Sequence, residues 1–583
     1  MQQFNRSGAL TALLVVACIT LVGTLARAER IERDGLVFDG VPALSEALQN
    51  QRLYYEAEAE TRFVDWLDDG SLLVIERRMG SEQLQRVAAP LGAREPQGSA
   101  GGALPLGPEA QQLAAAALRP EQPLGAHDGR QVAFAAAARG GTGTDLYVID
   151  TGSAALPRLV AGGSGRWQAM DWSLDDRLLL AVQQDPVAGV QLQLVDLQSG
   201  TVRRLDIQTG AARTSRISQA RFAAGGRSVL YLSDQDSEFA RLRRVELDDG
   251  TVRDLTPPRE RDVEMFASSP NGRRLAYVYN DHGASRLVLA DLRGGTERTL
   301  TTTPVGWIGA LKFDRAGERL AIDVESDVAP RDVYLVEFDS GAVTRWTRSE
   351  PDAANAGAPL LAQTLRFPTW DRQNGGPRQL TARIYRPASG TTHPVLLLLP
   401  GGSRQPRQHF DPLLQYLVRE LGYVVIVPAL RGSGGQGRSF AALDDNGLVN
   451  DPVRDVGSLL VWAGLQTDLD RSRFAIMGSG DSSQLALASL AQFGDRLRAA
   501  IAVDGSLVVA QPQAVRGPVL IVRGVAGPLS SRSSAEQLMW RLRAAGAEVW
   551  LAGSSEESTV ALGADRQNQL ARTIVQFLQS ANR

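Results

Sequence analysis

The sequence of 583 residues is poor in several chemically active side chains. It has one cysteine, Cys18, four histidines and, among 62 basic residues, a single lysine, Lys312. Because Cys18 lies near the N-terminus, the rest of the chain offers no disulfide, thiol nucleophile or thiolate metal site. The net charge is only −3 and the arginines are scattered, so nothing favours a nucleic-acid partner. H-E-x-x-H and Walker motifs are also absent, so no metal and no cofactor are predicted.

Long hydrophobic runs are rare as well, and the main one is N-terminal. Arg6 precedes "ALTALLVVACITLVGTL" (residues 9–25), and Ala26-Arg27-Ala28 forms an A-x-A site before Glu29. This pattern predicts export to a bacterial periplasm or to the medium, with cleavage after Ala28. An uncleaved membrane anchor is the alternative, since the run is just long enough for a short span. A lipoprotein-like box ending at Cys18 is a third possibility.

The first half of the chain repeats a turn followed by an apolar strand. Copies include "HDGRQVAFA" (127–135), "PNGRRLAYV" (270–278) and "RAGERLAID" (315–323), and the turns from Gly129 onward recur about every 45–50 residues. Most copies continue with a second strand and turn, as in "QLQLVDLQSGTVRRLD". Such units are four-stranded blades of a β-propeller. Six are legible, and we expect a seventh to be completed by residues 30–60 or by strands from both ends, within a propeller of residues 29–350.

The pattern changes near residue 350. A Pro/Ala/Gly-rich linker spans residues 351–361, and apolar strands then alternate with helical segments through residues 362–583. Continuous apolar strands such as "PVLLLLPGG" and "YVVIVPAL" are typical of a parallel sheet covered on both faces. The second domain is therefore predicted to be α/β.

Motifs in the second domain resemble those of the prolyl oligopeptidase family, whose members join a β-propeller to an α/β-hydrolase domain. "LGYVVIVPALRGSGGQGRSF" is similar to the family's R-G-S-x-G-x-G loop, and "DRSRFAIMG" is similar to its approach to the nucleophile. "HPVLLLLPGGS" resembles the strand that ends at the oxyanion site. The resemblance implies a serine-hydrolase fold with a strand, a sharp turn and a helix presenting the nucleophile.

The same register leaves the three catalytic positions without their usual residues. The family's G-x-S-x-G-G falls on residues 478–483, so Gly480 stands at the nucleophile position, followed by Ser482 and Ser483 where glycines belong. The acid position falls on Gly527, and the general-base position on Ser558 or Thr559. No histidine follows His409. We therefore predict that the triad is lost.

Several other residues are candidates for a substitute nucleophile, a base or a ligand contact. Ser482 or Ser479, with His409 as base, would give a relocated nucleophile. Asp481 is expected to cap the following helix, with Gln484 completing a capping box. As ligand candidates we retain Gly401 and Gly402 at the oxyanion strand, Asp481, and Arg431 of the R-G-S loop. For the two glycines and for Arg431, a structural role in the turn or loop is the favoured interpretation.

Three functions remain open from the sequence. The favoured hypothesis is an exported pseudo-peptidase that binds a peptide or protein between the propeller and the hydrolase domain. The second is an active serine peptidase or esterase with a relocated nucleophile. The third is a propeller-based envelope scaffold. Under all three, a membrane contact is predicted only through an uncleaved N-terminal segment, and the oligomeric state stays open.

Overall fold

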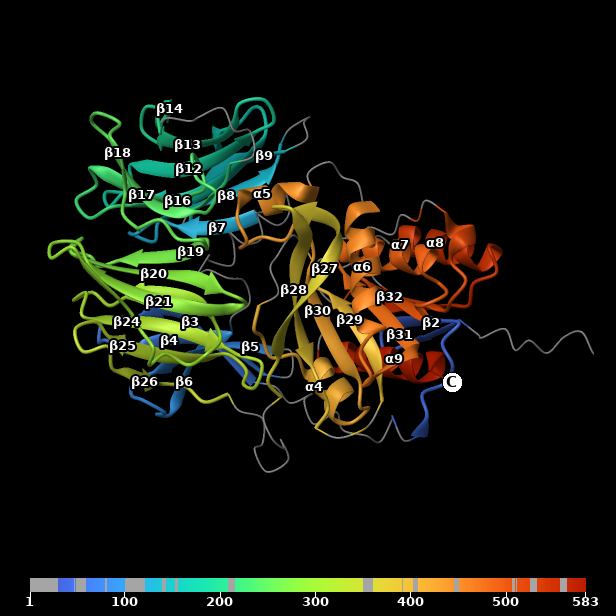
Figure 1. Ribbon diagram of the computed structural model, residues 1–583. Coiled ribbons are helices and arrows are strands. Elements are labelled where there is room, and N and C mark those ends of the chain that lie inside the picture. The colour runs from blue at the N-terminus through green and yellow to red at the C-terminus, as the bar shows by residue number, and fades with distance from the viewer. Residues whose placement is uncertain are drawn as a thin grey trace, which may run out of the picture.

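The computed structural model has two lobes, a ring of small sheets and an α/β domain (Figure 1). It describes residues 30–582 except 47, 49–58, 79–80, 100–120, 139–142, 152–155, 208–214, 350–359, 389, 391, 402–406, 445–449, 506–508, 510, 525–531 and 556–563. The predicted signal segment with Cys18 and Ala28, and most of the predicted linker, lie outside these residues. In the part of the chain that is described, no helix is both long and apolar enough to span a bilayer.

The first lobe is a β-propeller, as the repeats predict. Within the described residues it holds six units of four antiparallel strands, of which the second and third are joined in one eight-stranded sheet by a parallel bridge between Arg166 and Thr144. The first three are β3 (Ala59–Trp66), β4 (Leu72–Arg78), β5 (Ser81–Val87), β6 (Arg94–Ser99); β7 (Glu121–Gly125), β8 (Gln131–Ala137), β9 (Thr144–Asp150), β10 (Arg158–Ala161); and β11 (Arg166–Trp172), β12 (Leu178–Asp185), β13 (Gly189–Asp196), β14 (Val202–Arg204). The others are β15 (Ile217–Phe222), β16 (Ser228–Ser233), β17 (Arg241–Glu246), β18 (Val252–Asp254); β19 (Val263–Ser268), β20 (Arg274–Asp281), β21 (Ala284–Asp291), β22 (Thr296–Thr299); and β23 (Trp307–Phe313), β24 (Arg319–Glu325), β25 (Asp332–Glu337), β26 (Val343–Arg345).

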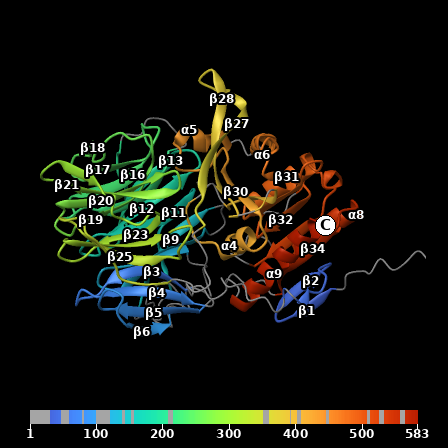
Figure 2. The ribbon, with the colours of Figure 1, turned by 60° about the horizontal axis from the view of Figure 1, so that its bottom comes forward.

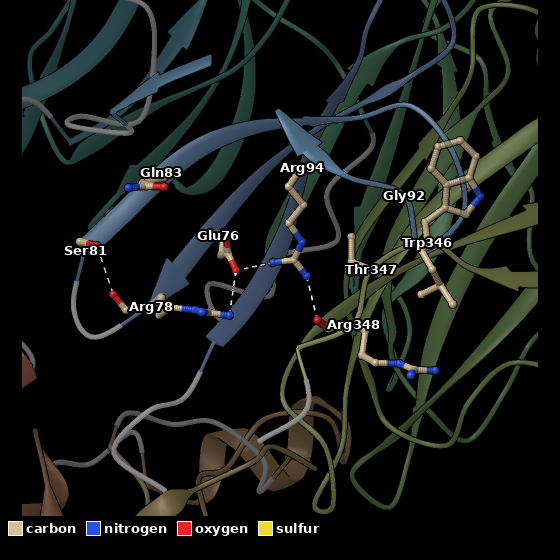
Figure 3. Close-up of a pocket in the computed structure, with 10 residues that line it drawn as sticks. Glu76, Arg78, Ser81, Gln83, Gly92, Arg94, Trp346, Thr347 and Arg348 are labelled. Carbon is tan, nitrogen blue, oxygen red and sulfur yellow. Dashed lines mark hydrogen bonds and ion pairs between the residues drawn. The ribbon is translucent and has the colours of Figure 1, made fainter. Parts of the chain in front are cut away.

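The first and last blades close on each other without sharing a strand. Phe63, Trp66 and Val74 of the first blade form one apolar cluster with Ala321 and Leu335 of the last. The backbone N–H of Thr61 also donates to the carbonyl of Arg331 (2.9 Å). Figure 3 shows the same seam, where Arg94 of β6 donates to the carbonyl of Arg348 just after β26 (2.8 Å). Apolar packing and hydrogen bonds between side chain and backbone therefore join the two blades.

Asp323 of β24 is a buried carboxylate at this seam, and it gives the propeller a pH-dependent stability. It accepts hydrogen bonds from the backbone N–H groups of Phe63 (3.1 Å) and Gly309 (3.1 Å). Burial raises its pKa from 3.8 to about 6, although the charge of Arg331 opposes the shift. The native protein therefore keeps a proton that the unfolded chain releases, and stability falls as pH rises from about 4 to about 6.

Replacing Asp323 with asparagine should remove this dependence. Relative to Asp323→Asn, the wild-type free energy of unfolding should fall by about 3 kcal/mol between pH 4 and pH 7, the equivalent of two pKa units. Denaturant unfolding of both proteins across that range measures the difference. A difference that stays constant with pH would contradict the assignment.

The second lobe is built on one ten-stranded sheet in the order β1-β2-β34-β33-β32-β31-β29-β30-β28-β27. Its parallel centre is β29 (His393–Leu399), β30 (Val424–Ala429), β31 (Leu469–Ser479), β32 (Ala499–Val503), β33 (Val519–Arg523) and β34 (Val549–Ser554). The hairpin of β27 (Gln363–Gln373) and β28 (Gly376–Tyr385) adds an antiparallel edge next to β30. The predicted α/β domain is thus present, with antiparallel strands at both edges.

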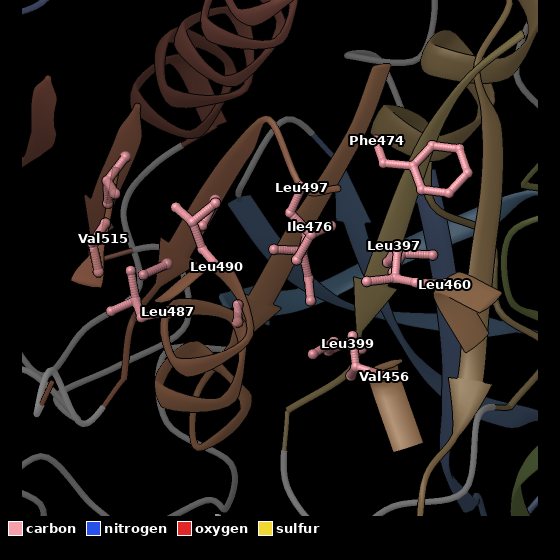
Figure 4. Close-up of a cluster of buried hydrophobic side chains, with 14 of the residues drawn as sticks. Leu397, Leu399, Val456, Leu460, Phe474, Ile476, Leu487, Leu490, Leu497 and Val515 are labelled. Atoms are coloured by element: carbon pink, nitrogen blue, oxygen red, sulfur yellow. The ribbon is translucent and has the colours of Figure 1, made fainter. Parts of the chain in front are cut away.

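Helices cover both faces of this sheet. The helices are α4 (Pro412–Arg419), α5 (Arg438–Ala441), α6 (Asn450–Ala463), α7 (Ser482–Gln492), α8 (Arg532–Ala544) and α9 (Ala564–Ala581), with short 3₁₀ turns at Ala442–Asp444 and Pro512–Ala514. Helices α6, α7 and α8 pack on one face, where Leu460, Leu487 and Leu490 meet Leu397 and Ile476 of the strands (Figure 4). Helices α4 and α9 pack on the other face. Burial on both faces explains why these strands are apolar at every position.

The prediction that residues 30–60 help complete a seventh blade is wrong for residues 31–39, and so is the propeller boundary at residue 29. Strands β1 (Ile31–Arg33) and β2 (Leu36–Asp39) form a hairpin on the α/β sheet, where β2 pairs with β34. Figure 2 shows them beside α9 and away from the propeller. Leu36 is fully buried, and Asp39 pairs with Arg543 of α8 (2.8 Å). The hairpin covers an edge of the sheet that would otherwise expose unpaired backbone groups.

Candidate functional site

The turn between β31 and α7 lies at the carboxyl end of the parallel strands, where α/β folds place their ligands. Gly480 stands in this turn with φ +56°, and its N–H donates to the carbonyl of Val503 (2.8 Å). A Cβ on Gly478 would lie 2.0 Å from the carbonyl oxygen of Ser482, so that position accepts only glycine. The strand, sharp turn and helix are therefore those expected from the sequence, and the left-handed residue of the turn has no side chain.

Two serine hydroxyls fill the base of this turn. The Ser482 hydroxyl donates to the carbonyl of Pro400, at the end of β29 (2.7 Å). The Ser483 hydroxyl is buried and lies 3.0 Å from the carbonyl of Gly478 and 2.8 Å from that of Val503. These contacts tie the first turn of α7 to the ends of β29, β31 and β32. The hydroxyl that we considered as a displaced nucleophile thus has a structural partner.

The predicted capping of α7 by Asp481 is wrong. Asp481 does occupy the N-cap position, but its φ and ψ (−61°, −27°) are helical and its side chain makes no capping hydrogen bond. A capping side chain needs an extended backbone at that position to reach the following N–H groups. The carboxylate of Asp481 is instead exposed, and it places a negative charge where a hydrolase would stabilise an oxyanion.

Gly401 faces Ser479 across the same edge of the sheet. A Cβ on Gly401 would lie 2.8 Å from the carbonyl oxygen of Ser479 and 3.0 Å from its hydroxyl. Close approach of the two chains therefore accounts for this glycine. Gly402, the second glycine of the predicted oxyanion pair, lies outside the described residues.

The acid and base positions give no side chain to place. Gly527, Ser558 and Thr559 all lie outside the described residues. Strand β33 ends at the buried Arg523, whose guanidinium donates to the carbonyl of Ser554 (3.3 Å). Asp504, which follows β32, was not among the residues predicted from the sequence. Its φ is +41°, and its carboxylate accepts a hydrogen bond from the N–H of Gly524, the residue after β33. Its left-handed backbone could not be read from the "AVDG" stretch.

Three of the four histidines have local partners elsewhere in the fold. His127 contacts Asp176 (2.9 Å) and His282 contacts Asp281 (2.8 Å), both within the propeller. His393 is buried, with Nδ1 at 2.9 Å from the carbonyl of Gly422. His409 is exposed just before α4. Among the described residues no cluster of three metal-binding side chains occurs.

Arg431 is the centre of a buried ion-pair network. Its Nε and Nη2 lie 2.7 and 2.6 Å from the two carboxylate oxygens of Asp455, which is fully buried in α6. Nη2 also lies 3.2 Å from Asp371 of β27, and the guanidinium stacks on Trp370 (4.4 Å to the ring centre). Burial raises the pKa of Asp371, but the hydrogen bond from Arg378 and the charge of Arg431 outweigh it, so the pKa is lowered. The guanidinium of Arg431 is therefore engaged in structural contacts, which favours its structural role over a ligand contact.

The α/β domain docks on the propeller through charged groups that sequence reasoning missed. Arg383 of β28 pairs with Asp327, between β24 and β25, and both side chains are buried. The hydroxyl of Tyr385 donates to the same carboxylate (2.9 Å), and the Gln415 amide donates to the carbonyl of Asp327 (2.7 Å). The contacts join segments 56 to 88 residues apart, a separation that no local pattern reveals.

A second docking contact uses the R-G-S loop. The N–H of Arg438, at the start of α5, donates to the carbonyl of Glu238 (2.7 Å), and the Ser439 hydroxyl donates to the Glu238 carboxylate (2.7 Å). Glu264 of β19 faces Arg407 at 3.4 Å, and burial raises the pKa of this carboxyl. The junction of the lobes is therefore lined by acidic groups of the propeller and arginines of the α/β domain.

Comparison with known proteins identifies this architecture. The model of the prolyl oligopeptidase family matches residues 408–515. A solved puromycin hydrolase has 17% identity and a TM-score of 0.68, over 95% of this chain and 94% of its own. A structure from a study of two prolyl endopeptidases has 15% identity and a TM-score of 0.65, over 98% and 94%. Prolyl oligopeptidase B from Galerina marginata, bound to a 35mer substrate, has 12% identity and a TM-score of 0.67, over 92% and 91%.

No curated protein matches the chain significantly. These three structures are below 20% identical to the chain, so they establish the shared fold of propeller and hydrolase domain and no more. The family match runs from four residues before α4 to the residue after the 3₁₀ turn at Pro512–Ala514, and it includes the R-G-S loop and the turn at Gly480. Residues 408–515 therefore match the prolyl oligopeptidase family, and the chain as a whole shares the fold of these solved structures.

Proposed function

We propose that this protein is a non-catalytic, exported relative of the prolyl oligopeptidases that binds a peptide or protein at the junction of its two lobes. The observation that carries the proposal is the turn at Gly480. The position from which a hydrolase presents its nucleophile has no side chain, while the neighbouring hydroxyls of Ser482 and Ser483 are held by backbone carbonyls. Acyl transfer needs both a nucleophile and a base that accepts its proton.

The proposed ligand class rests on the retained architecture. A similar solved structure holds a 35-residue peptide, which shows that this fold accommodates long peptides in that protein. Here the junction keeps ordered, charged contacts on both sides, including Asp327 with Arg383 and Glu238 with Ser439. The Asp327–Arg383 pair is buried, but Glu238 and Ser439 are accessible, and such polar groups suit the backbone and termini of a peptide.

The alternative of a relocated nucleophile needs a rearrangement. Ser482 would have to give up its hydrogen bond to Pro400, and a base would have to approach it. His409 is exposed, and no described hydrogen bond joins it to Ser479 or Ser482. Catalytic hydrogen bonds are often long or misaligned in an enzyme without its ligand. Peptide cleavage is therefore measured directly.

Binding without cleavage is the expected result. The full chain is incubated with a mixture of synthetic peptides, free peptide is removed by dialysis, and retained peptide is identified by mass spectrometry. We expect peptides retained at their intact mass. New peptide termini would show a peptidase, and no retained peptide would contradict the proposed ligand. Heat-unfolded protein serves as the control for non-specific retention.

Restoring the missing hydroxyl alone should not restore activity. In Gly480→Ser a residue with a side chain must hold its backbone at φ near +56°, so we expect the free energy of unfolding to fall by about 1–2 kcal/mol. Turnover of a chromogenic peptide should stay at the level of Gly480→Ala, which carries the same backbone strain without a hydroxyl, because triad residues act as a unit. Turnover clearly above that of the alanine variant would mean that a base is present.

A further inference from the structure

A pocket of about 690 Å³ lies at the seam between the first and last blades of the propeller (Figure 3). This volume is within the range of pockets that take small ligands. It is lined by β4 and β5, by the segment between β5 and β6, by the first residue of β6, and by the residues that follow β26. The turn at Gly480 is not part of it, so the pocket is separate from the site described above.

The pocket carries a surplus of positive charge. Three arginines line it, Arg78, Arg94 and Arg348, against one carboxylate, Glu76. Glu76 pairs with Arg94 and lies 3.7 Å from Arg78. The side chain of Arg348 is exposed and pairs with no acidic group among the described residues, although its carbonyl accepts a hydrogen bond from Arg94. One guanidinium is therefore available, and a second, that of Arg78, is weakly held.

Leu91 adds an apolar group that stability does not explain. Its φ is +54°, a left-handed conformation that costs a side-chain-bearing residue about 1–2 kcal/mol. Its N–H donates to the carbonyl of Trp346 (3.0 Å), which fixes it beside the pocket. The side chain is 52% exposed, so it gains little from burial. A glycine would make the same turn without strain.

We infer that this pocket binds a peptide carboxylate that has an apolar side chain next to it. The planar guanidinium of Arg348 matches a carboxylate. Leu91 offers an apolar contact to a neighbouring side chain of the bound peptide. Gln83 and Ser81 provide neutral polar groups for the peptide backbone. The carboxylate can be a chain terminus or an acidic side chain, and the experiment distinguishes them.

The test is isothermal titration calorimetry of the full chain with three probes: acetyl-Ala-Ala-Leu with a free carboxylate, its C-terminal amide, and acetyl-Leu-Asp-amide. We expect the free acid or the aspartyl probe to bind with a Kd below about 1 mM, and the amide at least tenfold more weakly. Whichever acid binds identifies the source of the carboxylate. Binding of neither acid, or equal binding of acid and amide, would overturn the inference. So would inorganic phosphate binding as tightly as the peptide.

Two variants separate a binding role from a structural one. Arg348→Gln should weaken binding about tenfold or more, since a charge-assisted hydrogen bond is lost, whereas Arg130→Gln on another blade should not change it. Leu91→Gly should weaken binding without lowering Tm, because relief of the strained backbone offsets the flexibility of glycine. Unchanged affinity in both pocket variants would overturn the assignment. Because Arg348 and Leu91 lie outside the turn at Gly480, the result does not depend on the proposed lack of catalysis.

Discussion

Replacing Arg431 with alanine is expected to lower the free energy of unfolding of the α/β domain by about 3–5 kcal/mol. Asp455 has no exposed surface and pairs with Arg431 through both carboxylate oxygens. Without the arginine, its charge is left uncompensated in the protein interior, which is what makes the loss of one partner so costly. For a domain of this size the change corresponds to a fall in Tm of roughly 6–20 °C.

The control for this prediction is Arg454→Ala. Arg454 also stacks on Trp370, but its side chain is half exposed, so its removal should cost about 1 kcal/mol or less. Thermal unfolding of the two variants is compared with that of Arg431→Met/Asp455→Leu, which removes both charges and should recover much of the loss. Equal, small effects for Arg431→Ala and Arg454→Ala would show that the network is not a stabilising centre.

Replacing Asp327 with alanine should have an effect of similar size, about 3–5 kcal/mol, but on the docking of the two lobes. The change leaves the buried guanidinium of Arg383 without its counter-charge and the Tyr385 hydroxyl without its acceptor. Burial also raises the pKa of Tyr385, so the hydroxyl stays protonated and needs that acceptor. The lobes should separate more readily, which small-angle scattering detects as a larger radius of gyration and limited proteolysis as faster cleavage between them.

Asp339→Ala is the matched control for the docking prediction. Asp339 also pairs with an arginine, Arg274, but its side chain is 79% exposed and the pair lies within the propeller. We expect no change in the radius of gyration and little change in stability. An Asp327→Ala protein with unaltered scattering and unaltered proteolysis would contradict the role of this carboxylate in holding the lobes together.

The fold could be read from the sequence where its signals are periodic. Turns recurring every 45–50 residues predicted the blades, and uninterrupted apolar runs such as residues 394–399 predicted the buried parallel strands. The hairpin of β1 and β2 could not be assigned in this way. Its residues are a short apolar segment next to a turn, which fits the edge of either lobe, and only pairing with β34, more than 500 residues away, decides between them.

The sequence predicted where the candidate site lies but not the hydrogen bonds that its side chains make. The register placed Gly480 in the turn, and the glycine spacing of the R-G-S loop located Arg431. The hydrogen bonds of Ser482 and Ser483 were not foreseen, because they depend on how the ends of β29 and β32 lie against the turn. The same holds for the partners of Arg431: Asp371 and Asp455 come from a strand and a helix separated by 84 residues of sequence. Side-chain partners brought together by the tertiary fold leave no local pattern.

The proposed lack of catalysis depends on the absence of a reactive nucleophile, and covalent labelling tests this most directly. The purified full chain is treated with a fluorophosphonate, beside an active prolyl oligopeptidase, and intact masses are recorded. We predict that the active enzyme gains the mass of one adduct while this protein gains none. An adduct that disappears in Ser482→Ala or Ser479→Ala would contradict the proposed lack of catalysis and establish a working serine at this turn.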